Sequence, residues 1–302
     1  MSDLQLSIII PSFNTQAILK NCLDSILGNT KDISYEIIVI ENGSTDGSLK
    51  MLQSYSQKTK VLKVINVKEN LGFGKANNLG ASNAKGDYLL FLNSDTLIFD
   101  NSLKACLQNL KQHPNVGVYS CRLLNTDKTT QESGGHFPSL FNLFAWQFGI
   151  DDLPIIGNLI PSFHPQKSQH DLNKKMDWVT GAFMIIPKNI FNDVNGFDEK
   201  IFMYTEEMEL AYRITKLGYK TLNQNSPAII HLGKASGGSE LAITSEVDNM
   251  LYFWQKHMPA WQVPLVKFAF FFGSLLRLIL FGIIKQDEKY KRAYLKALKL
   301  SL

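Results

Sequence analysis

The stretch YLLFLNSDTLIF, residues 88–99, decides how the rest of the chain is interpreted. Five apolar or aromatic residues lead into Asn93, Ser94 and Asp95, after which apolar residues resume. An apolar run that ends in small polar residues indicates a buried strand followed by a turn. Asn-Ser-Asp after a strand is more often a turn than a ligand site. The role of Asp95 therefore has to be inferred from the elements around this strand.

Strand-like runs alternate with helical patterns through the first third of the chain. The strand-like runs cover residues 6–10, 36–40, 61–65 and 87–92. The helical patterns cover residues 15–28, 46–56, 73–84 and 100–112. Alternation at this spacing predicts βαβ crossovers, and hence an α/β fold with a mostly parallel central sheet flanked by helices. Ligands of such sheets bind beyond the carboxyl ends of the strands.

The ends of these four strands are all polar. They read Pro11-Ser12-Phe13-Asn14, Glu41-Asn42-Gly43-Ser44, Asn70-Leu71-Gly72 and Asn93-Ser94-Asp95. A carboxylate such as Glu41 can accept a hydrogen bond from the imide N–H of a pyrimidine, and Lys75 could reach a phosphate. Capping and packing roles explain the same loops equally well when each is taken alone.

The second half of the chain is less regular. Residues 125–175 contain several prolines and glycines, and we expect a long loop with a short aromatic helix at about 139–148. A strand is predicted at 178–187, a helix at 204–219 that Gly218 ends, and a further strand that ends at His231. Acidic residues in the first turn of that helix either complement its dipole or include a general base. His231 is either structural or completes a metal site with Asp95.

The bulk composition is that of a globular protein. The 302 residues are 45% hydrophobic and 19% charged, which excludes a disordered chain. Cys22, Cys106 and Cys121 follow no metal-ligand spacing, so we expect reduced core thiols in a cytosolic protein. The first residues resemble no signal peptide.

The positive charge is concentrated in the tail. Residues 264–302 carry eight Lys/Arg against two Asp/Glu, whereas the rest carries 23 against 25. This favours a local anionic partner and argues against nucleic acid. The apolar run 264–284, interrupted by Lys267 and Arg277, predicts a helix lying in a membrane interface. A single spanning helix and a core or dimer helix are the alternatives. We expect a domain at 1–245 and a membrane-associated tail at 246–302.

Seven motifs in fixed order carry a family resemblance. They are IIPSFN (9–14), ENGSTDGS (41–48), NLGFGKANN (70–78), LNSDT (92–96), GAF (181–183), GFDE (196–199) and EEMELAYR (206–213). Together, over about residues 5–235, they closely resemble the inverting family 2 glycosyltransferases of the GT-A fold. The chain looks most like the bacterial rhamnosyltransferase branch, which builds cell-surface polysaccharide on a lipid carrier.

The resemblance implies a nucleotide-diphosphate sugar donor, either a dTDP- or a UDP-sugar, carrying rhamnose or another hexose. Asp95 falls on the D-x-D-type motif and would bind Mg²⁺ or Mn²⁺, and His231 would complete the metal site. The positions that fall on the nucleotide pocket are Pro11, Ser12, Phe13, Asn14, Glu41, Gly43, Ser44, Gly72, Phe73, Lys75, Asn78, Asn93, Ser94 and Asp95.

The resemblance also implies the groups around the acceptor. Glu207 aligns with the catalytic base, with Glu206 in reserve, and Trp178, Gly181 and Ala182 would line the sugar and acceptor pocket. The acceptor would be lipid-linked or a polysaccharide, used at the cytoplasmic face of the cell membrane, to which 264–302 would bind peripherally.

The chain departs from the family pattern at three positions. Asn93 replaces an acidic residue, so metal binding is expected to be weaker. Glu41 and Glu207 each stand where Asp is usual, and both side chains are one methylene longer.

Two other classes of protein stay open. A non-catalytic nucleotide-sugar-binding or scaffold protein would share the fold, although the intact acidic motifs argue against it. A sugar nucleotidyltransferase would have a Gly-rich, basic loop after the first strand, where this chain has Pro-Ser-Phe-Asn. A homodimer is compatible with the sequence.

Overall fold

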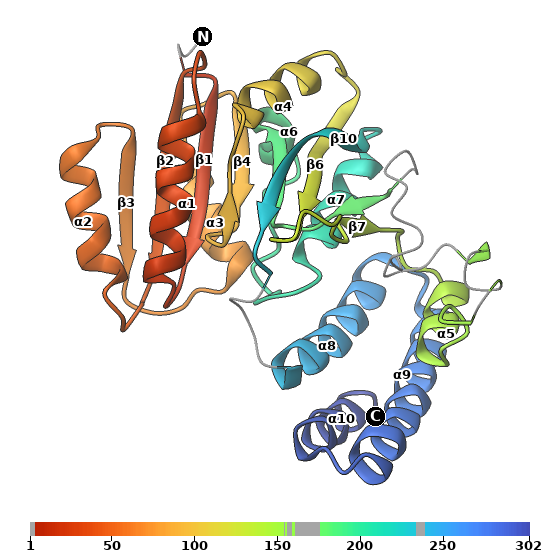
Figure 1. The fold of residues 1–302 in the computed structure, drawn as a ribbon. Coiled ribbons are helices and arrows are strands. Elements are labelled where there is room, and N and C mark those ends of the chain that lie inside the picture. Colours follow the sequence, from red (N-terminus) through yellow and green to blue (C-terminus); the bar gives the residue numbers. More distant parts are fainter. Residues whose placement is uncertain (1–3, 154, 156–158, 161–175, 234–238) are drawn as a thin grey trace. The chain divides into compact units, whose positions relative to one another are not determined.

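The computed structural model describes residues 4–153, 155, 159–160, 176–233 and 239–302. The chain forms two compact units (Figure 1). Unit 1 comprises Met1–Gly134, His170–Phe202 and Glu206–Ala235, and unit 2 comprises Gly135–Gln169, Met203–Thr205 and Ser236–Leu302. The prolines expected in the long loop at 154, 161 and 165 lie outside the described residues.

Unit 1 is built on an eight-stranded sheet in the order β3-β2-β1-β4-β9-β6-β10-β5. Its strands are β1 (Leu6–Ser12), β2 (Tyr35–Asn42), β3 (Leu62–Val67), β4 (Tyr88–Leu92), β5 (Thr96–Leu97), β6 (Val116–Leu124), β9 (Phe183–Pro187) and β10 (Lys220–His231). The first four strands in the order are mutually parallel, as are β6 and β10. β9 runs antiparallel to β4 and β6, and β5 antiparallel to β10. The expected mostly parallel α/β sheet is confirmed.

Helices follow the strands as predicted in the first third of the chain. They are α1 (Gln16–Asn29), α2 (Ser48–Lys58), α3 (Phe73–Ser82) and α4 (Ser102–Lys111), joined later by α6 (Lys188–Asp193) and α7 (Glu206–Lys216). The helix α7 ends at Lys216, two residues before Gly218, which was predicted to end it.

One predicted strand is wrong. Residues 178–187 form two strands, β8 (Trp178–Val179) and β9, and the stretch Thr180–Ala182 separates them. β8 pairs with β7 (Gly134–Gly135) in a separate two-stranded sheet, whereas β9 joins the main sheet. The continuous apolar pattern hid this break, because both halves are buried and both look like one strand.

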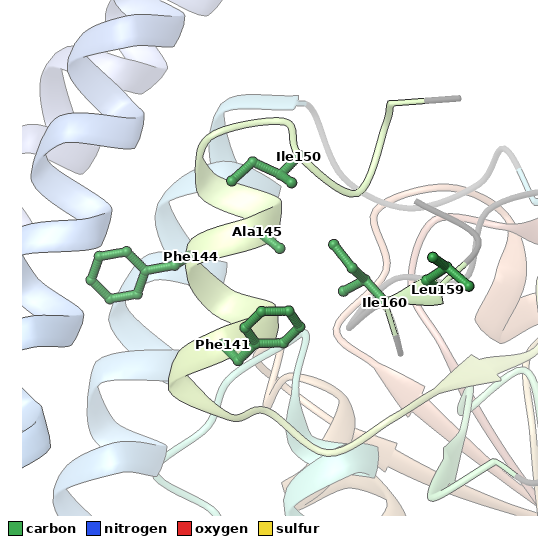
Figure 2. A pocket seen from close by; sticks show the side chains of 6 residues that line it. All are labelled: Phe141, Phe144, Ala145, Ile150, Leu159 and Ile160. Atoms are coloured by element: carbon green, nitrogen blue, oxygen red, sulfur yellow. The ribbon is translucent and has the colours of Figure 1, made fainter. Parts of the chain in front are cut away.

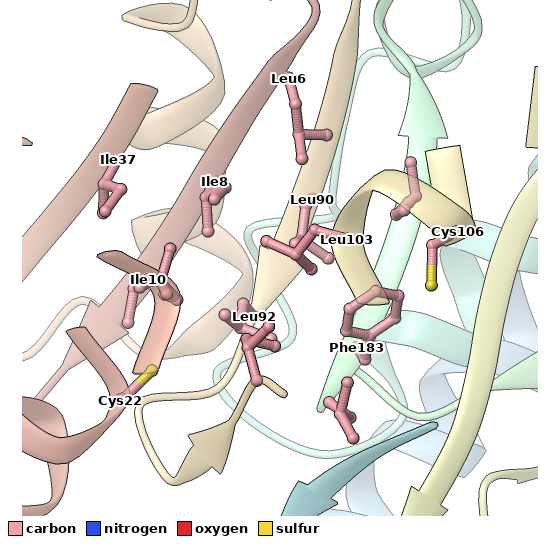
Figure 3. Close-up of a cluster of buried hydrophobic side chains, with 14 of the residues drawn as sticks. Leu6, Ile8, Ile10, Cys22, Ile37, Leu90, Leu92, Leu103, Cys106 and Phe183 are labelled. Carbon is pink, nitrogen blue, oxygen red and sulfur yellow. The ribbon is translucent and has the colours of Figure 1, made fainter. Parts of the chain in front are cut away.

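The core lies where α1, α2 and α4 cover one face of the sheet (Figure 3). Ile8 and Ile10 of β1 belong to this cluster together with Cys22 of α1. Ile9 points to the opposite face, as the alternation of a strand requires. All three cysteines are free and buried, as expected for core thiols.

On the opposite face, α3 packs closely on β1 at Gly80. A Cβ atom at this position would lie 2.3 Å from Cγ2 of Ile9, a fully buried β-branched residue. Glycine thus sets the distance between helix and sheet, and through it the position of the loop that begins α3.

Unit 2 is helical. It contains α5 (Leu140–Gln147), α8 (Ser239–His257), η3 (Ala260–Gln262), α9 (Val263–Arg277), the π-helical segment η4 (Leu278–Ile284) and α10 (Glu288–Leu300). The short aromatic helix expected at about 139–148 is therefore confirmed as α5. The stretch Ala260–Ile284 is long and apolar enough to cross a bilayer, and about a third of its most apolar window is buried in the protein.

Arg277 interrupts the apolar run, and its guanidinium has hydrogen-bond acceptors inside unit 2. Its guanidinium donates to the carbonyl oxygens of Gln147 and Trp146, at 2.7 and 2.8 Å, and lies 5.6 Å from the centre of the Trp146 ring. The last carbonyls of a helix have no partner within the helix, and here a cation binds them. Arg277 thus joins α9 to the end of α5.

An apolar pocket of about 440 Å³ lies beside α5. Figure 2 shows its lining side chains, Phe141, Phe144, Ala145, Ile150, Leu159 and Ile160. Phe144 also stacks on Phe268 of α9, with ring centroids 6.5 Å apart.

We expect Gly80→Ala to destabilise the protein by about 1–3 kcal/mol, because the added methyl group has to displace Ile9. Equilibrium urea unfolding followed by circular dichroism measures the change. The matched control is Gly28→Ala in α1, where an added Cβ meets nothing within 4 Å. That change should raise the free energy of unfolding by up to about 1 kcal/mol. Equal effects of the two substitutions would contradict the close contact.

Candidate active site

Asp95 and His231 meet at the edge of the main sheet. β10 pairs with β5 so that His231 lies opposite Thr96, and the backbone N–H of Leu232 donates to the carbonyl of Asp95 at 2.8 Å. The His231 Nε2 atom is 3.3 Å from Asp95 Oδ1. Both side chains are largely buried, at 16% and 7% exposure. The structure thus brings together two residues that are far apart in the sequence.

Asn93 belongs to the same cluster. Its Nδ2 lies 3.4 Å from Nε2 of His231, and its backbone N–H donates to the carbonyl of Ala182 at 3.1 Å. The hydroxyl of Thr96 donates to the carbonyl of Asn93 at 2.9 Å. Asn93, Asp95 and His231 therefore share one small, well-supported site.

Cys22 packs behind this loop, beside the Thr96 hydroxyl and the Asn93 carbonyl. Burial raises the pKa of its thiol to about 12. The thiol is thus protonated at neutral pH and is no nucleophile or metal ligand.

The chemistry of the Asp95 and His231 side chains fits Mn²⁺ or Mg²⁺. A carboxylate oxygen is the ordinary ligand of both ions, and an imidazole nitrogen, a softer donor, suits Mn²⁺ better than Mg²⁺. Among the described residues, no group of three or more His, Cys, Asp or Glu is placed to hold a metal. A pair of protein ligands is what a substrate-completed site needs, because Mg²⁺-type ions often take their other ligands from water and substrate phosphates.

The ends of β1 and β2 are adjacent, and hydrogen bonds join the loops that follow them. Ser12 and Glu41 are paired in the parallel register. The backbone N–H of Asn14 donates to Ser44 Oγ at 2.9 Å, and Asn14 Oδ1 accepts from the backbone N–H of Thr45 at 2.8 Å. The polar segments of these two strand ends therefore lie side by side, as the parallel sheet predicts.

Glu41 is buried, with 1% of its surface exposed. Its Oε1 accepts the backbone N–H of Ser44 at 2.7 Å, which fixes the turn through Gly43. One carboxylate oxygen thus shapes the loop. Contact with a base stays a prediction for this residue.

The loop that begins α3 is held by Asn42. Its Oδ1 accepts the N–H of Leu71 at 2.9 Å, and its Nδ2 donates to the carbonyl of Gly72 at 3.3 Å. Gly72 has φ +78°, and a Cβ there would lie 2.2 Å from the carbonyl oxygen of Phe202. Glycine is needed at this position because both the backbone conformation and the space exclude a side chain.

The remaining predicted pocket residues differ in exposure and contacts. Lys75 is exposed at the start of α3. Asn78 bonds the backbone of Phe197 through both its amide atoms and also reaches Glu199, so it holds that segment in place. Phe73 lies against Gly181 and packs edge-on to Phe197, with ring centroids 5.9 Å apart. Trp178 and Ala182 are buried.

The acidic residues of α7 have three different environments. Glu209 is fully buried and bound by Arg213 through two guanidinium nitrogens, at 2.6–3.0 Å, so it is structural. Glu206 is buried at 4% exposure, whereas Glu207 is partly exposed. Burial first, and then the negative charge of Glu207, raise the pKa of the Glu206 carboxyl well above its ordinary value of 4.5.

The backbone just before α7 is unusual. Tyr204 and Thr205 have φ of +68° and +79°, a left-handed conformation that costs non-glycine residues free energy. In unit 2, the amide of Asn249 on α8 donates to the carbonyls of Met203 and Tyr204, at 2.9 and 2.8 Å. Strain of this kind is common at functional sites, and here it immediately precedes the two candidate bases.

Sequence reasoning missed the supporting residues of the site. Asn42 lies inside a quoted motif, but its amide contacts depend on where residues 70–72 fold. The Glu209–Arg213 pair has the i, i+4 spacing of a helical ion pair and could have been found from that spacing. Gln131, which contacts His231, lies in a stretch with no recognisable pattern.

Known proteins resemble this chain in sequence. A family model described as Glycosyl transferase family 2 matches residues 7–193. The chain is 27% identical over 235 residues to the O-antigen biosynthesis protein RfbC of Myxococcus xanthus, a match that covers 77% of this chain and 18% of that protein. It is 23% identical over 248 residues to an N-acetylglucosaminyl-diphospho-decaprenol L-rhamnosyltransferase of Mycobacterium tuberculosis, covering 76% of this chain and 78% of that enzyme.

Solved structures share the fold. A mannosyltransferase of Pyrobaculum calidifontis in complex with GDP-Man and Mn²⁺ superposes with a TM-score of 0.59 at 14% identity, covering 98% of this chain and 85% of that one. Together with the family match, this confirms the expected GT-A fold.

We expect the free energy of unfolding to depend on pH through Glu206. Because its pKa is raised on folding, the folded chain binds this proton more tightly than the unfolded chain does. The stability that Glu206 contributes is therefore fully present below pH 4.5 and is lost as pH rises towards the raised value. Glu206→Gln keeps a neutral side chain, so the variant should gain stability relative to the parent chain progressively above pH 4.5.

Urea unfolding at a series of pH values measures this difference. Glu69→Gln changes an exposed carboxylate and serves as the control, expected to stay within about 0.5 kcal/mol of the parent chain at every pH. A Glu206→Gln difference that is flat between acidic and neutral pH would show that the carboxyl is charged in the folded chain.

Proposed function

The chain belongs to Glycosyl transferase family 2, and from that premise we propose that it is an inverting transferase. It moves a hexosyl group, such as rhamnose, from a nucleoside-diphosphate sugar to an acceptor hydroxyl. The observation that carries the proposal is the Asp95–His231 pair, 3.3 Å apart at the strand ends of unit 1. Two side chains that could bind one divalent ion thus lie in the same unit as the loop of Glu41 and Ser44.

The strand-end loops would bind the donor. The segments Pro11–Asn14, Glu41–Ser44 and Gly72–Asn78 supply backbone and side-chain polar groups, and Lys75 is exposed and free to approach a phosphate. The Asp95 carboxylate and His231 Nε2 would hold Mn²⁺ or Mg²⁺ beside the diphosphate. When bound, that ion would offset the negative charge that develops on the leaving diphosphate.

Glu207 would be the general base. Burial and the Glu207 charge raise the pKa of the Glu206 carboxyl beside it, so Glu206 is the poorer candidate for a charged base. Glu207 is the more exposed of the two, and its carboxylate would accept the proton. The acceptor hydroxyl gives its proton to Glu207, and its oxygen bonds to the anomeric carbon. The bond from that carbon to the diphosphate oxygen breaks on the opposite face, which inverts the configuration.

We expect Glu207→Gln to lower the transfer rate by about 10²–10⁴-fold while donor affinity stays within a few-fold, because a base acts in the chemical step. Asp95→Asn should instead abolish the Mn²⁺-dependent gain in donor affinity. The donor is first chosen from UDP-, dTDP- and GDP-hexoses by thermal shift with and without Mn²⁺. Calorimetry then measures binding, and release of nucleoside diphosphate measures transfer.

The control is Asp193→Asn, an exposed carboxylate at the end of α6, which should change neither quantity. Full transfer by Glu207→Gln would remove this residue as the base. Donor binding without transfer by the parent chain would favour a scaffold protein, and release of pyrophosphate would favour a nucleotidyltransferase.

We further propose that the acceptor is lipid-linked and that unit 2 binds the membrane surface. The name of the mycobacterial relative describes an acceptor on a decaprenol diphosphate. In this chain, apolar side chains are exposed along α9 and η4 and on α10. They are Leu265, Phe268, Phe272, Leu276, Ile279, Leu280, Ile283, Ile284, Leu295 and Leu300. Exposed cations lie beside them on the same segments, including Lys285, Lys289, Arg292 and Lys299.

An apolar face flanked by cations fits an anionic lipid surface. The hydrogen bonds of Arg277 to protein carbonyls would lower the cost of placing its charge near lipid. The apolar pocket on α5 has room for part of an isoprenoid chain. Unit 2 would therefore keep the covalently attached unit 1 at the cytoplasmic membrane face, where such acceptors are found.

We expect the chain to sediment with vesicles that contain phosphatidylglycerol and less with pure phosphatidylcholine. Replacing both Ile283 and Ile284, which are 60% and 67% exposed, by Glu should weaken the binding by more than about tenfold. Leu217→Glu, on an exposed leucine of unit 1, is the matched control. Unchanged sedimentation of the double variant would overturn the membrane face.

A further inference from the structure

The hydrogen bonds of Gln131 point to a role for this residue. Its Oε1 lies 2.8 Å from Nδ1 of the His231 ring, and its Nε2 donates to the backbone carbonyl of His231 at 2.7 Å. Gln131 therefore holds both the ring and the backbone of one residue. We propose that Gln131 is the positioning residue that fixes the tautomer of His231 and directs its Nε2 lone pair at Asp95. This inference rests on the metal site of the proposed function.

The orientation of the Gln131 amide follows from its neighbours. A backbone carbonyl only accepts hydrogen bonds, so the group that faces the His231 carbonyl has to be the NH₂ group. The same NH₂ group donates to Asn125 Oδ1 at 2.7 Å. The Gln131 oxygen is thereby turned towards His231 Nδ1, and that nitrogen has to carry the proton.

A chain of hydrogen bonds fixes Asn125 in the same sense. The Asn125 NH₂ group donates to Thr129 Oγ1 at 2.8 Å, and the Thr129 hydroxyl donates to the Asp127 carboxylate at 2.6 Å. Because the Asp127 carboxylate only accepts, the Thr129 hydroxyl has to donate to it and accept from the Asn125 NH₂ group. The Asn125 oxygen is therefore turned towards Gln131. The backbone N–H of Gln131 also donates to the carbonyl of Leu123 at 2.8 Å, which ties the residue to the end of β6.

This tautomer has a consequence at the metal site. When the imidazole is neutral, its proton is on Nδ1, and Nε2 presents a lone pair. Nε2 then has the Asn93 amide donor at 3.4 Å on one side and Asp95 Oδ1 at 3.3 Å on the other, so its contact with Asp95 sets one acceptor against another. Asp95 Oδ1 and His231 Nε2 would hold a divalent cation, whose positive charge would offset this repulsion. Metal-binding histidines commonly have their second nitrogen fixed by such an acceptor, and losing it costs about 10–100-fold in metal affinity.

Two measurements on the full chain test the proposal. Nitrogen-15 NMR of labelled histidine, without metal and at a pH where His231 is neutral, should find its proton on Nδ1 in the parent chain. In Gln131→Leu that proton should move, at least in part, to Nε2. Titration with Mn²⁺ alone, with free ion followed by EPR, should show about 10–100-fold weaker binding by Gln131→Leu. Gln131→Glu, whose carboxylate still accepts from Nδ1 but cannot donate to the His231 carbonyl, should keep the proton on Nδ1 and bind Mn²⁺ more tightly than Gln131→Leu does.

Two controls separate positioning from folding. Gln53→Leu makes the same chemical change on the exposed side of α2 and should alter neither readout. In a His231→Ala background, Gln131→Leu should cause no further loss of Mn²⁺ affinity. A proton on Nε2 in the parent chain, or equal Mn²⁺ affinities of Gln131→Leu and the parent chain, would overturn the proposal. If the parent chain binds no Mn²⁺, the metal site of the proposed function is wrong. The NMR measurement is made without metal, so it still decides whether Gln131 fixes the His231 tautomer.

Discussion

The antiparallel pairing of β10 with the two-residue strand β5 is the constraint on which the site depends. It places His231 opposite Thr96 and lets the backbone of Leu232 bond that of Asp95. A histidine and an aspartate separated by more than a hundred residues are thereby fixed to each other by main-chain bonds. Side-chain contacts at the site then need no large adjustment, because the backbone already sets their separation. The parallel strands β1, β2 and β4 supply the other loops at the same edge.

The sequence predicted the strands and helices that carry the site, because the patterns that indicate them are local. Each strand of the first third is a short apolar run that ends in turn residues, and each helix has an apolar stripe at i, i+3 and i+4. Parallel strands have to bring their carboxyl ends to one edge, so Asp95 and Glu41 could be placed there without a structure. The break between β8 and β9 was missed, since two buried strands in succession leave one continuous apolar pattern.

Roles that depend on burial or on distant contacts could not be predicted. Glu206 and Glu207 are adjacent and chemically identical, and the difference between them arises because one is enclosed by the fold. Asn78 uses its amide to hold the backbone of Phe197, a contact that the sequence does not reveal, and its place in the nucleotide pocket stays a prediction. Arg277 interrupts an apolar run, and it does so because it binds the last carbonyls of α5. Each of these roles is set by residues far away in the sequence.

The hairpin that carries Gln131 has a consequence for how this enzyme can change over evolution. Residues 125–131 turn back at the end of β6, and Asp127 and Thr129 within them are exposed. Surface turns tolerate replacement far better than buried strands do. Under the proposal for Gln131, the residue that orients His231 would thus lie where mutations leave the sheet undisturbed. Metal affinity could then change among descendants of this chain while the proposed ligands Asp95 and His231 stay the same.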